Sequence, residues 1–408
     1  MTMPADIQTV GPWDAQNPRW SAALDDALHA RAIAVVREIP RAIPEPGSES
    51  TKAASVADGS AGHALFYAYA IRSGLFEQER DDLQDQMMAH LQLAVDRIQD
   101  VANYPFLFQG LAGVGWVANH LHALGLQDEV EDLCDAVDAA LIDWLQHHYA
   151  SMHCELIAGL AGLGAYGLAR WPRTGGREIV RLAVVALAAT SVEHRGFRTW
   201  FNSPENASEL KRSVQPRGSY NLGLSHGVPG ALAFLAKAGA LGMEEAGVLA
   251  NSACTWLLGV RSSYPNGSSF ARELLVDPGT QAEGSGLAWC YGDLGVSAAL
   301  MVSARLLRRA DCEAVALQVA RAAASREKAR VMDGGLCHGA FGNAHIFQRF
   351  FRATGEPCFL HAARRWLREG LDMRKQGQGL AGFWPGSREC HRLQRRTRGS
   401  RNPGFSKA

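Results

Sequence analysis

The stretch that decides the fold is residues 153–168, HCELIAGLAGLGAYGL, in which Gly159 and Gly162 form a Gly-x-x-Gly step that opens a short apolar segment. The step recurs along the chain, and successive first glycines are 47 to 68 residues apart. The other steps are Gly59/Gly62, Gly110/Gly113, Gly227/Gly230, Gly292/Gly295 and Gly339/Gly342. A self-similar pattern of this period is typical of a repeat architecture, in which each unit buries its apolar face against its neighbours.

Two kinds of helix are predicted within each repeat. After each step comes a short, Ala-rich stretch, which we interpret as a helix that is buried on most of its faces. Between steps the pattern becomes amphipathic, as in segment 127–148, where apolar residues recur three or four positions apart. These residues are Val130, Leu133, Val137, Leu141 and Trp144. Similar helices are expected at 78–99, 176–191, 243–258, 312–330 and 357–372.

A ring of helices accommodates both kinds. An inner ring of buried helices wrapped by an outer ring of amphipathic ones covers every apolar face, so the predicted fold is an all-α, α/α toroid. The glycines then lie at the start of each inner helix, at one end of the ring, where they permit close backbone approach. No convincing strand pattern appears. Two long polar gaps, 193–222 and 260–288, are interpreted as loops that form a substrate-binding rim.

The chain divides into three segments. We expect an N-terminal helix and linker at 1–54, the toroid at 55–383 and a basic, disordered tail at 384–408, which has five arginines between 388 and 398. Only six Gly-x-x-Gly steps can be identified in the sequence. The sequence GLAG at 379–382 imitates a seventh, but Pro385 would break a helix there. The seventh helix pair is therefore expected to be incomplete.

Composition excludes several classes of protein. The 408 residues include 41 Lys plus Arg and 41 Asp plus Glu, so no overall field favours nucleic acid or a membrane surface. The N-terminus lacks a secretory signal pattern and the longest apolar stretch is too short to span a bilayer, so we expect a cytoplasmic protein without a transmembrane segment. Eight cysteines in a chain of this length do not form a disulfide scaffold.

Chemically reactive residues gather at the last three steps. His226 precedes the fourth, Cys290 the fifth, and Cys337 with His338 the sixth. Two thiolates and one imidazole suit a catalytic zinc ion, which keeps its fourth position open. Spacing alone is a weak argument for three residues so far apart, and their equivalent places in the repeat strengthen it. The other cysteines within the predicted outer helices are expected to be core residues: Cys134, Cys254, Cys312 and Cys358.

The strings SHGVPG, WCYGDLG and CHGAFG, together with ELIAGLAGLG, resemble the signature of the lanthionine synthetase C-like family over about residues 55–382. The resemblance implies a toroid of seven inner and seven outer helices. It also implies one zinc ion per chain, an acid–base histidine, an active-site tyrosine and a nearby carboxylate. The matching residues are Cys290, Cys337 and His338 for zinc, His226 and Tyr291, and Glu155 where many members have aspartate.

One position departs from the family pattern. Gly286 stands where some peptide cyclases of the family have arginine, four residues before the first zinc cysteine. No arginine occurs between 273 and 304, so this protein must do without that cation or borrow another.

The function implied by the resemblance is zinc-dependent peptide cyclisation, in which cysteine thiols add to dehydroalanine or dehydrobutyrine and form (methyl)lanthionine rings. The expected partners are a dehydrated precursor peptide and a separate dehydratase, because the ring already fills the chain. Two alternatives stay open: a relative that adds glutathione to dehydrated residues, and a non-catalytic peptide-binding scaffold in a modification complex. A glycosidase is less favoured, because it needs paired carboxylates where this chain offers thiols and imidazoles.

Overall fold

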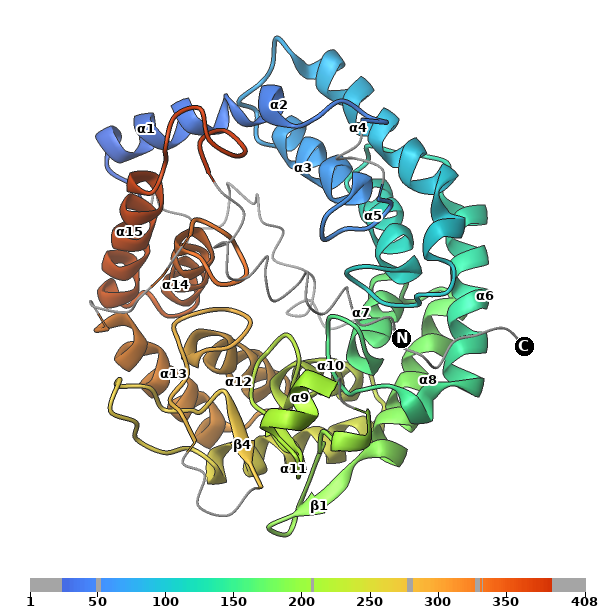
Figure 1. Ribbon diagram of the computed structural model, residues 1–408, viewed down its shortest axis with the longest axis vertical. Coiled ribbons are helices and arrows are strands. Elements are labelled where there is room, and N and C mark those ends of the chain that lie inside the picture. The colour runs from blue at the N-terminus through green and yellow to red at the C-terminus, as the bar shows by residue number, and fades with distance from the viewer. Residues whose placement is uncertain are drawn as a thin grey trace.

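The computed structural model describes residues 24–48, 53–206, 209–276, 282–326, 331 and 333–383. Within them, six helix pairs follow one another around a ring, as Figure 1 shows. The inner helices are α3 (Ser60–Arg72), α5 (Leu111–Ala123), α7 (Leu160–Ala169), α10 (Val228–Ala240), α12 (Asp293–Leu307) and α14 (Ala340–Thr354). The outer helices are α4 (Arg80–Asp96), α6 (Glu131–His147), α8 (Thr174–Thr190), α11 (Glu244–Gly259), α13 (Ala310–Ala324) and α15 (Pro357–Asp372).

The predicted α/α toroid is confirmed. Each inner helix packs against the outer helix that follows it, and the side chains between the two rings, such as Trp256, Phe347 and Trp366, are fully buried. The predicted outer helices agree with the observed ones to within a few residues, with one exception. Segment 312–330 was expected to be helical throughout, but α13 ends at Ala324, and 327–330 lie outside the described residues.

The first glycine of each step is the N-cap of an inner helix, because the chain returns on itself there. A Cβ atom on Gly110 would lie 2.0 Å from the carbonyl oxygen of Tyr104, well inside any normal contact. The next residue, Leu111, donates its N–H to that same carbonyl at 2.8 Å. Equivalent bonds run from Leu160 to His153 and from Ala340 to Asp333. We call the six residues before each N-cap glycine the pre-cap loop.

At the second to fifth steps, the second glycine of the step lies against a side chain of the preceding repeat. A Cβ atom on Gly162 would lie 3.3 Å from Cβ of Leu107, and one on Gly295 would lie 3.1 Å from Cβ of Leu224. A larger residue at this position would push neighbouring repeats apart. The step therefore combines a tight turn with close packing between repeats.

Main-chain hydrogen bonds join successive pre-cap loops into a continuous chain. In each of the first five loops, the residue two positions before the N-cap glycine donates its N–H to the carbonyl of the equivalent residue in the next repeat. The bonds are Ala57 to Phe108, Phe108 to Ile157, Ile157 to Ser225, Ser225 to Cys290 and Cys290 to Cys337. The pre-cap loops are thus held side by side at one end of the ring.

The two long gaps contain short strands that were not predicted. The first gap holds the hairpin of β1 (Val192–His194) and β2 (Phe197–Thr199), then η5 (Pro204–Asn206) and α9 (Glu209–Val214). It ends in β3 (Ser219–Asn221), which pairs antiparallel with β4 (Glu273–Leu275) of the second gap. Three-residue strands are too short to show an alternating pattern, and β3 pairs with a segment more than 50 residues away.

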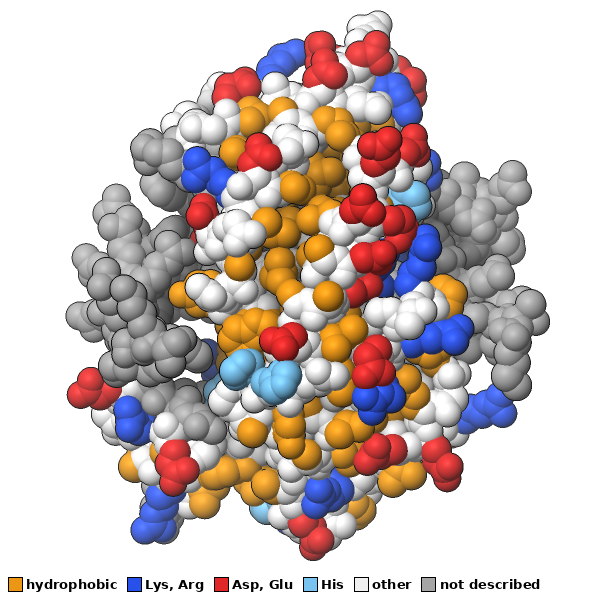
Figure 2. Space-filling view, turned by 90° about the vertical axis from the view of Figure 1, so that its right-hand side faces the viewer, with side chains coloured by type: hydrophobic (Ala, Val, Ile, Leu, Met, Phe, Trp, Pro, Cys, Tyr) orange, Lys and Arg blue, Asp and Glu red, His pale blue; other side chains and the backbone are white. Residues whose placement is uncertain are grey.

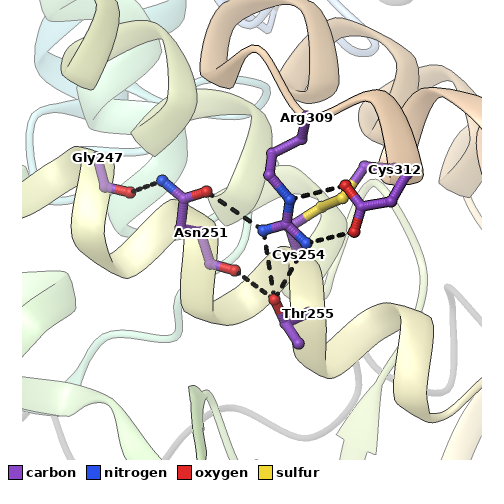
Figure 3. Close-up of a disulfide and its surroundings, with 7 residues drawn as sticks. Gly247, Asn251, Cys254, Thr255, Arg309 and Cys312 are labelled. Atoms are coloured by element: carbon purple, nitrogen blue, oxygen red, sulfur yellow. Dashed lines mark hydrogen bonds and ion pairs between the residues drawn. A yellow bond between two sulfur atoms is a disulfide. The ribbon is translucent and has the colours of Figure 1, made fainter.

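Of the four cysteines expected in the core, three are buried and one is not. Cys134 is buried, and Cys254 of α11 forms a buried disulfide with Cys312 of α13, as Figure 3 shows. Arg309 lies beside the disulfide and donates to Asn251 and Thr255 of α11 (Figure 3). The prediction for Cys358 was wrong. It is the second residue of α15 and is exposed, whereas the next residue, Phe359, is fully buried, so Cys358 lies on the outward face of the helix.

The N-terminal helices join the last pair to the first. Helix α1 (Asp26–Val36) packs on α15 through Leu28, Val35 and Leu371, and Tyr67 of α3 donates to a carbonyl of α2 (Ile39–Ala42). Figure 1 shows both helices between α15 and α3. Residues 379–383 form a turn with positive φ at Gly379, Ala381 and Gly382. The predicted disordered tail, 384–408, lies outside the described residues.

The distribution of charged side chains on the surface is consistent with the equal numbers of acidic and basic residues in the sequence. Figure 2 shows the face on the side of α4, α6 and α8, where acidic and basic side chains both occur among hydrophobic ones. None of the described helices is long and apolar enough to cross a membrane.

Two further one-turn helices, η3 (Ile98–Val101) and η4 (Tyr149–Ser151), close the turns before the second and third pre-cap loops.

Candidate metal and catalytic site

The predicted site residues occupy equivalent positions in adjacent pre-cap loops. His226, Tyr291 and His338 each stand directly before an N-cap glycine, and Cys290 and Cys337 stand one residue earlier. Because the main-chain bonds hold these loops side by side, the five side chains meet at one end of the ring. Although Cys337 and His338 are adjacent in the sequence, their ligand atoms lie close together at the start of α14.

Cys290, Cys337 and His338 form a group that could hold a metal ion. Their ligand atoms all lie within 4.8 Å of one another, and Sγ of Cys290 is 4.0 Å from Nδ1 of His338. A tetrahedral zinc ion with bonds of about 2.0 to 2.3 Å holds its ligand atoms roughly 3.5 to 4 Å apart, so the spacing fits. Cys290 is half-buried and Cys337 is exposed, which leaves the group open to a substrate.

Asp333 supports the metal-type histidine and was missed by the sequence analysis. Its Oδ2 atom lies 3.3 Å from Nε2 of His338, and its Oδ1 atom accepts the N–H of Gly335 at 2.7 Å. A carboxylate on the distal nitrogen of a ligand histidine orients the ring and selects its tautomer. Asp333 lies in the same pre-cap loop as His338, five residues earlier, and that short spacing is a signal that could have identified it.

The environment favours a thiolate at Cys290. Hydrogen bonding with Cys337 lowers the pKa of the Cys290 thiol to about 5, and His338 contributes to the same shift. The nearby Asp333 carboxylate raises the pKa of His338 to about 10, and Cys290 contributes again. Soft, deprotonated sulfur ligands are those that zinc prefers. The donor chemistry of the group therefore fits zinc.

His226 and Glu155 form a pair beside this group. Nδ1 of His226 contacts the Glu155 carboxylate, which leaves Nε2 facing away from that carboxylate. The side chain of Glu155 is 10% exposed and that of His226 is 40% exposed, so a buried acid holds an accessible imidazole. Such an arrangement fixes the tautomer and the direction of a proton-transferring histidine.

Tyr291 lies between His226 and a second polar pair that was also missed. Its ring stacks against that of His226 with 5.8 Å between centroids. Its hydroxyl oxygen accepts from Nδ2 of Asn221 at 3.0 Å, and Asn221 in turn contacts Glu273 at 3.1 Å. Burial raises the pKa of Tyr291 to about 12, so the phenol keeps its proton at neutral pH. That proton is free to be donated elsewhere.

Comparison with known proteins agrees with this geometry. Residues 50–380 match the family model described as lanthionine synthetase C-like protein. The chain belongs to the lanthionine synthetase C-like family. Among solved structures, nisin cyclase superposes with a TM-score of 0.68 at 18% sequence identity, covering 92% of this chain and 94% of that chain. Likeness at this level of identity establishes the shared toroidal fold.

The departure from the family pattern at Gly286 leaves open space in the structure. A Cβ atom there would have only the carbonyl oxygen of Tyr291 nearby, at 3.7 Å. Arg326 approaches this position and donates to the Gly286 carbonyl at 3.3 Å, but it also pairs with the buried carboxylate of Asp293 at 3.3 Å. Its side chain is 11% exposed. The donors of Arg326 are therefore engaged by groups of the protein itself.

Proposed function

We propose that this protein is a zinc-dependent peptide cyclase that adds cysteine thiols to dehydroalanine or dehydrobutyrine residues and so forms (methyl)lanthionine thioether rings. The observation that carries the proposal is the convergence of two cysteines and a histidine, in metal-ligand geometry, beside the His226–Glu155 pair at one end of the ring. Membership of the lanthionine synthetase C-like family supports the same reaction class.

Cys290, Cys337 and His338 would hold one zinc ion with an open position for the substrate sulfur. A peptide thiol has an ordinary pKa of about 8.5, so little thiolate exists at neutral pH. Zinc at this site would lower that pKa. The thiolates of Cys290 and Cys337 would balance the charge of the ion, so a substrate thiolate there would keep its nucleophilic character. Asp333 holds His338 in the orientation that this requires.

His226 is the proposed proton carrier. The thiol proton passes to Nε2 of His226, and the sulfur electron pair forms a bond with the β-carbon. The π electrons of the double bond move toward the carbonyl oxygen and form an enolate. His226 then returns its proton to the α-carbon, so the net reaction is addition of S–H across the double bond. Glu155 orients the imidazole and stabilises its charged form.

Tyr291 donates a hydrogen bond to the substrate carbonyl. Its oxygen accepts from Asn221, so its own proton is available for a bond with the substrate. The substrate and partners in this proposal are a dehydrated precursor peptide and a separate dehydratase that prepares it in the cytoplasm.

The test uses a dehydrated, cysteine-containing peptide and follows loss of free thiol by mass spectrometry after alkylation. We expect His226→Ala to retain one zinc ion per chain and to lower the cyclisation rate by about 10²- to 10⁴-fold. Glu155→Gln should cause a smaller loss, because it acts through the histidine. His147→Ala, at an exposed position on α6, is the matched control and should leave the rate unchanged.

Other outcomes separate the alternatives. If Cys290→Ala still bound one zinc ion per chain, the assignment of Cys290 as a zinc ligand would be wrong. Glutathione adducts in place of internal rings would identify a glutathione-adding enzyme, and zinc content without turnover would indicate a binding scaffold. If Glu155→Gln were the more damaging variant, Glu155 itself would carry the proton.

A further inference from the structure

An exposed arginine outside the predicted site lies against its tyrosine. The guanidinium carbon of Arg272 is 5.1 Å from the centre of the Tyr291 ring. Among the described residues, the Arg272 side chain makes no hydrogen bond and no ion pair, and this contact is the one that the structure records for it. A fully charged side chain beside reactive groups therefore keeps its donors available.

The backbone at Arg272 is held firmly. Its N–H donates to the carbonyl of Glu283 at 3.3 Å, and its carbonyl accepts from the N–H of Leu222 at 3.0 Å. The next residue, Glu273, begins β4 and pairs with Asn221 of β3. Since Asn221 also donates to Tyr291, the strand pair places the arginine and the tyrosine in one framework.

The other arginine near the site cannot serve the same purpose. Arg326 approaches Gly286, but its donors are engaged by Asp293 and by the carbonyls of Ser285 and Gly286. Removing it would leave the buried Asp293 carboxylate without its cation. Arg272 is the arginine that combines proximity to Tyr291 with exposure and free donors.

We propose that Arg272 is a catalytic residue that binds the carbonyl oxygen of the dehydrated residue and stabilises the negative charge that this oxygen acquires during thiol addition. The inference rests on the proposed cyclase function. It identifies Arg272 as the cation that takes the place of an arginine at position 286. It assigns this role to the residue directly before β4, which lies in the same connection between α11 and α12 as Gly286.

The chemistry requires a donor at this place. When the sulfur–carbon bond forms, the electron pair of the carbon–carbon double bond is displaced and the charge comes to rest on the carbonyl oxygen. The α-carbon that His226 protonates is two bonds from that oxygen, so the oxygen lies among the neighbours of His226. Tyr291 is one of them and Arg272 contacts Tyr291. Guanidinium groups form strong, directional hydrogen bonds with oxyanions.

The first experiment compares cyclisation rates of Arg272→Gln, Arg272→Lys and the matched control Arg177→Gln. Arg177 lies over the ring of Trp171 at 5.4 Å, which is the same kind of contact on an outer helix. We expect Arg272→Gln to lower kcat by about 10²-fold with little change in KM and in Tm, because the charge develops only in the transition state. Arg272→Lys should recover part of kcat, and Arg177→Gln should match wild type.

The second experiment needs no turnover and so distinguishes failure of this inference from failure of the proposed function. Calorimetry compares binding of 3-mercaptopropionate with that of the neutral 3-mercaptopropionamide. The carboxylate of the former stands the same number of bonds from sulfur as the enolate oxygen does. We expect wild type and Arg177→Gln to prefer the acid by about 10- to 100-fold, and Arg272→Gln to lose the preference.

The outcomes are decisive in each direction. A preference for the acid that depends on Arg272 supports the inference even if no dehydrated peptide is cyclised, in which case the proposed function alone fails. Equal affinity for the two thiols in wild type, no binding of either, or an unchanged kcat in Arg272→Gln overturns it.

Discussion

At the scale of single residues, the acid next to His226 shows how a changed side chain can be accommodated. Glu155 is longer than the aspartate that many family members are expected to have, yet its carboxylate contacts Nδ1 of His226. Glu155 starts from a buried position in the third pre-cap loop, and His226 ends the fourth. The Glu155 side chain therefore reaches from one repeat to the histidine of the next.

A buried histidine far from the site should make the fold sensitive to acid. Neither ring nitrogen of His90, on α4, has a hydrogen-bond partner among the described residues, and the ring packs against His63 and Tyr67. Burial lowers the pKa of His90 to about 4, and the nearby His63 adds to this shift. The neutral ring is thus favoured in the folded state.

The direction of the pH effect follows from this lowered pKa. The unfolded chain binds a proton at His90 near pH 6.5, whereas the folded protein resists it until about pH 4, so stability falls as the pH decreases between these values. We expect the loss of unfolding free energy between pH 7 and pH 5 to be smaller by about 2 kcal/mol in His90→Leu than in wild type. Urea unfolding at both pH values measures it. An identical pH dependence in the two proteins would contradict the assignment.

At the scale of secondary-structure elements, the glycine step explains why the inner helices start where they do. The first glycine allows the chain to pass within contact of the residue six positions earlier, and the second allows the neighbouring repeat to approach. Both requirements concern space rather than an unusual backbone conformation, since the N-cap glycines have extended φ values, for example −141° at Gly110.

The substitution Gly110→Ala tests this explanation. Its Cβ would collide with the backbone of Tyr104 and Phe106 at 2.0 to 2.8 Å, which backbone shifts must relieve. We expect a loss of about 2 to 4 kcal/mol in unfolding free energy, in the range of other strongly overpacked sites. Gly247→Ala in α11 is the control. Its nearest atom is 4.0 Å away, so the better helix propensity of alanine should leave stability equal or up to about 1 kcal/mol higher. Thermal or urea unfolding compares the two, and equal effects would refute the packing argument.

At the scale of the whole molecule, the candidate metal site is peripheral to the core. The core fills the space between the inner and outer rings, whereas the metal-type residues lie in loops at one end. The ring is therefore a scaffold that brings pre-cap loops from different repeats together, and its stability comes from helix packing.

Metal removal should consequently leave the ring folded. We expect chelation of zinc to abolish cyclisation while the far-ultraviolet circular dichroism at 25 °C stays unchanged and Tm falls by about 5 °C or less. A small zinc domain, by contrast, unfolds without its ion because the metal supplies its folding energy. Loss of the helical signal on chelation would show that the ion holds the ring together.

The amino-acid sequence by itself determined the ring and the offsets of its reactive residues. Helix periodicity and the Gly-x-x-Gly step are local patterns, and local backbone geometry fixes which residues start or line a helix. For this reason the toroid, the outer helices and the placement of Cys290, Cys337 and His338 at equivalent loop positions could be predicted. The short strands were not predicted because a strand of three residues is too short to show an alternating pattern.

Only the tertiary structure decided which residues of different repeats touch. The contact of Asn221 with Tyr291, the Cys254–Cys312 disulfide and the contact of Arg272 with Tyr291 depend on how closely the repeats approach and how the long loops pair. The first two of these contacts join residues 70 and 58 positions apart. Such distances are set by packing around the ring, which no local pattern of side chains encodes.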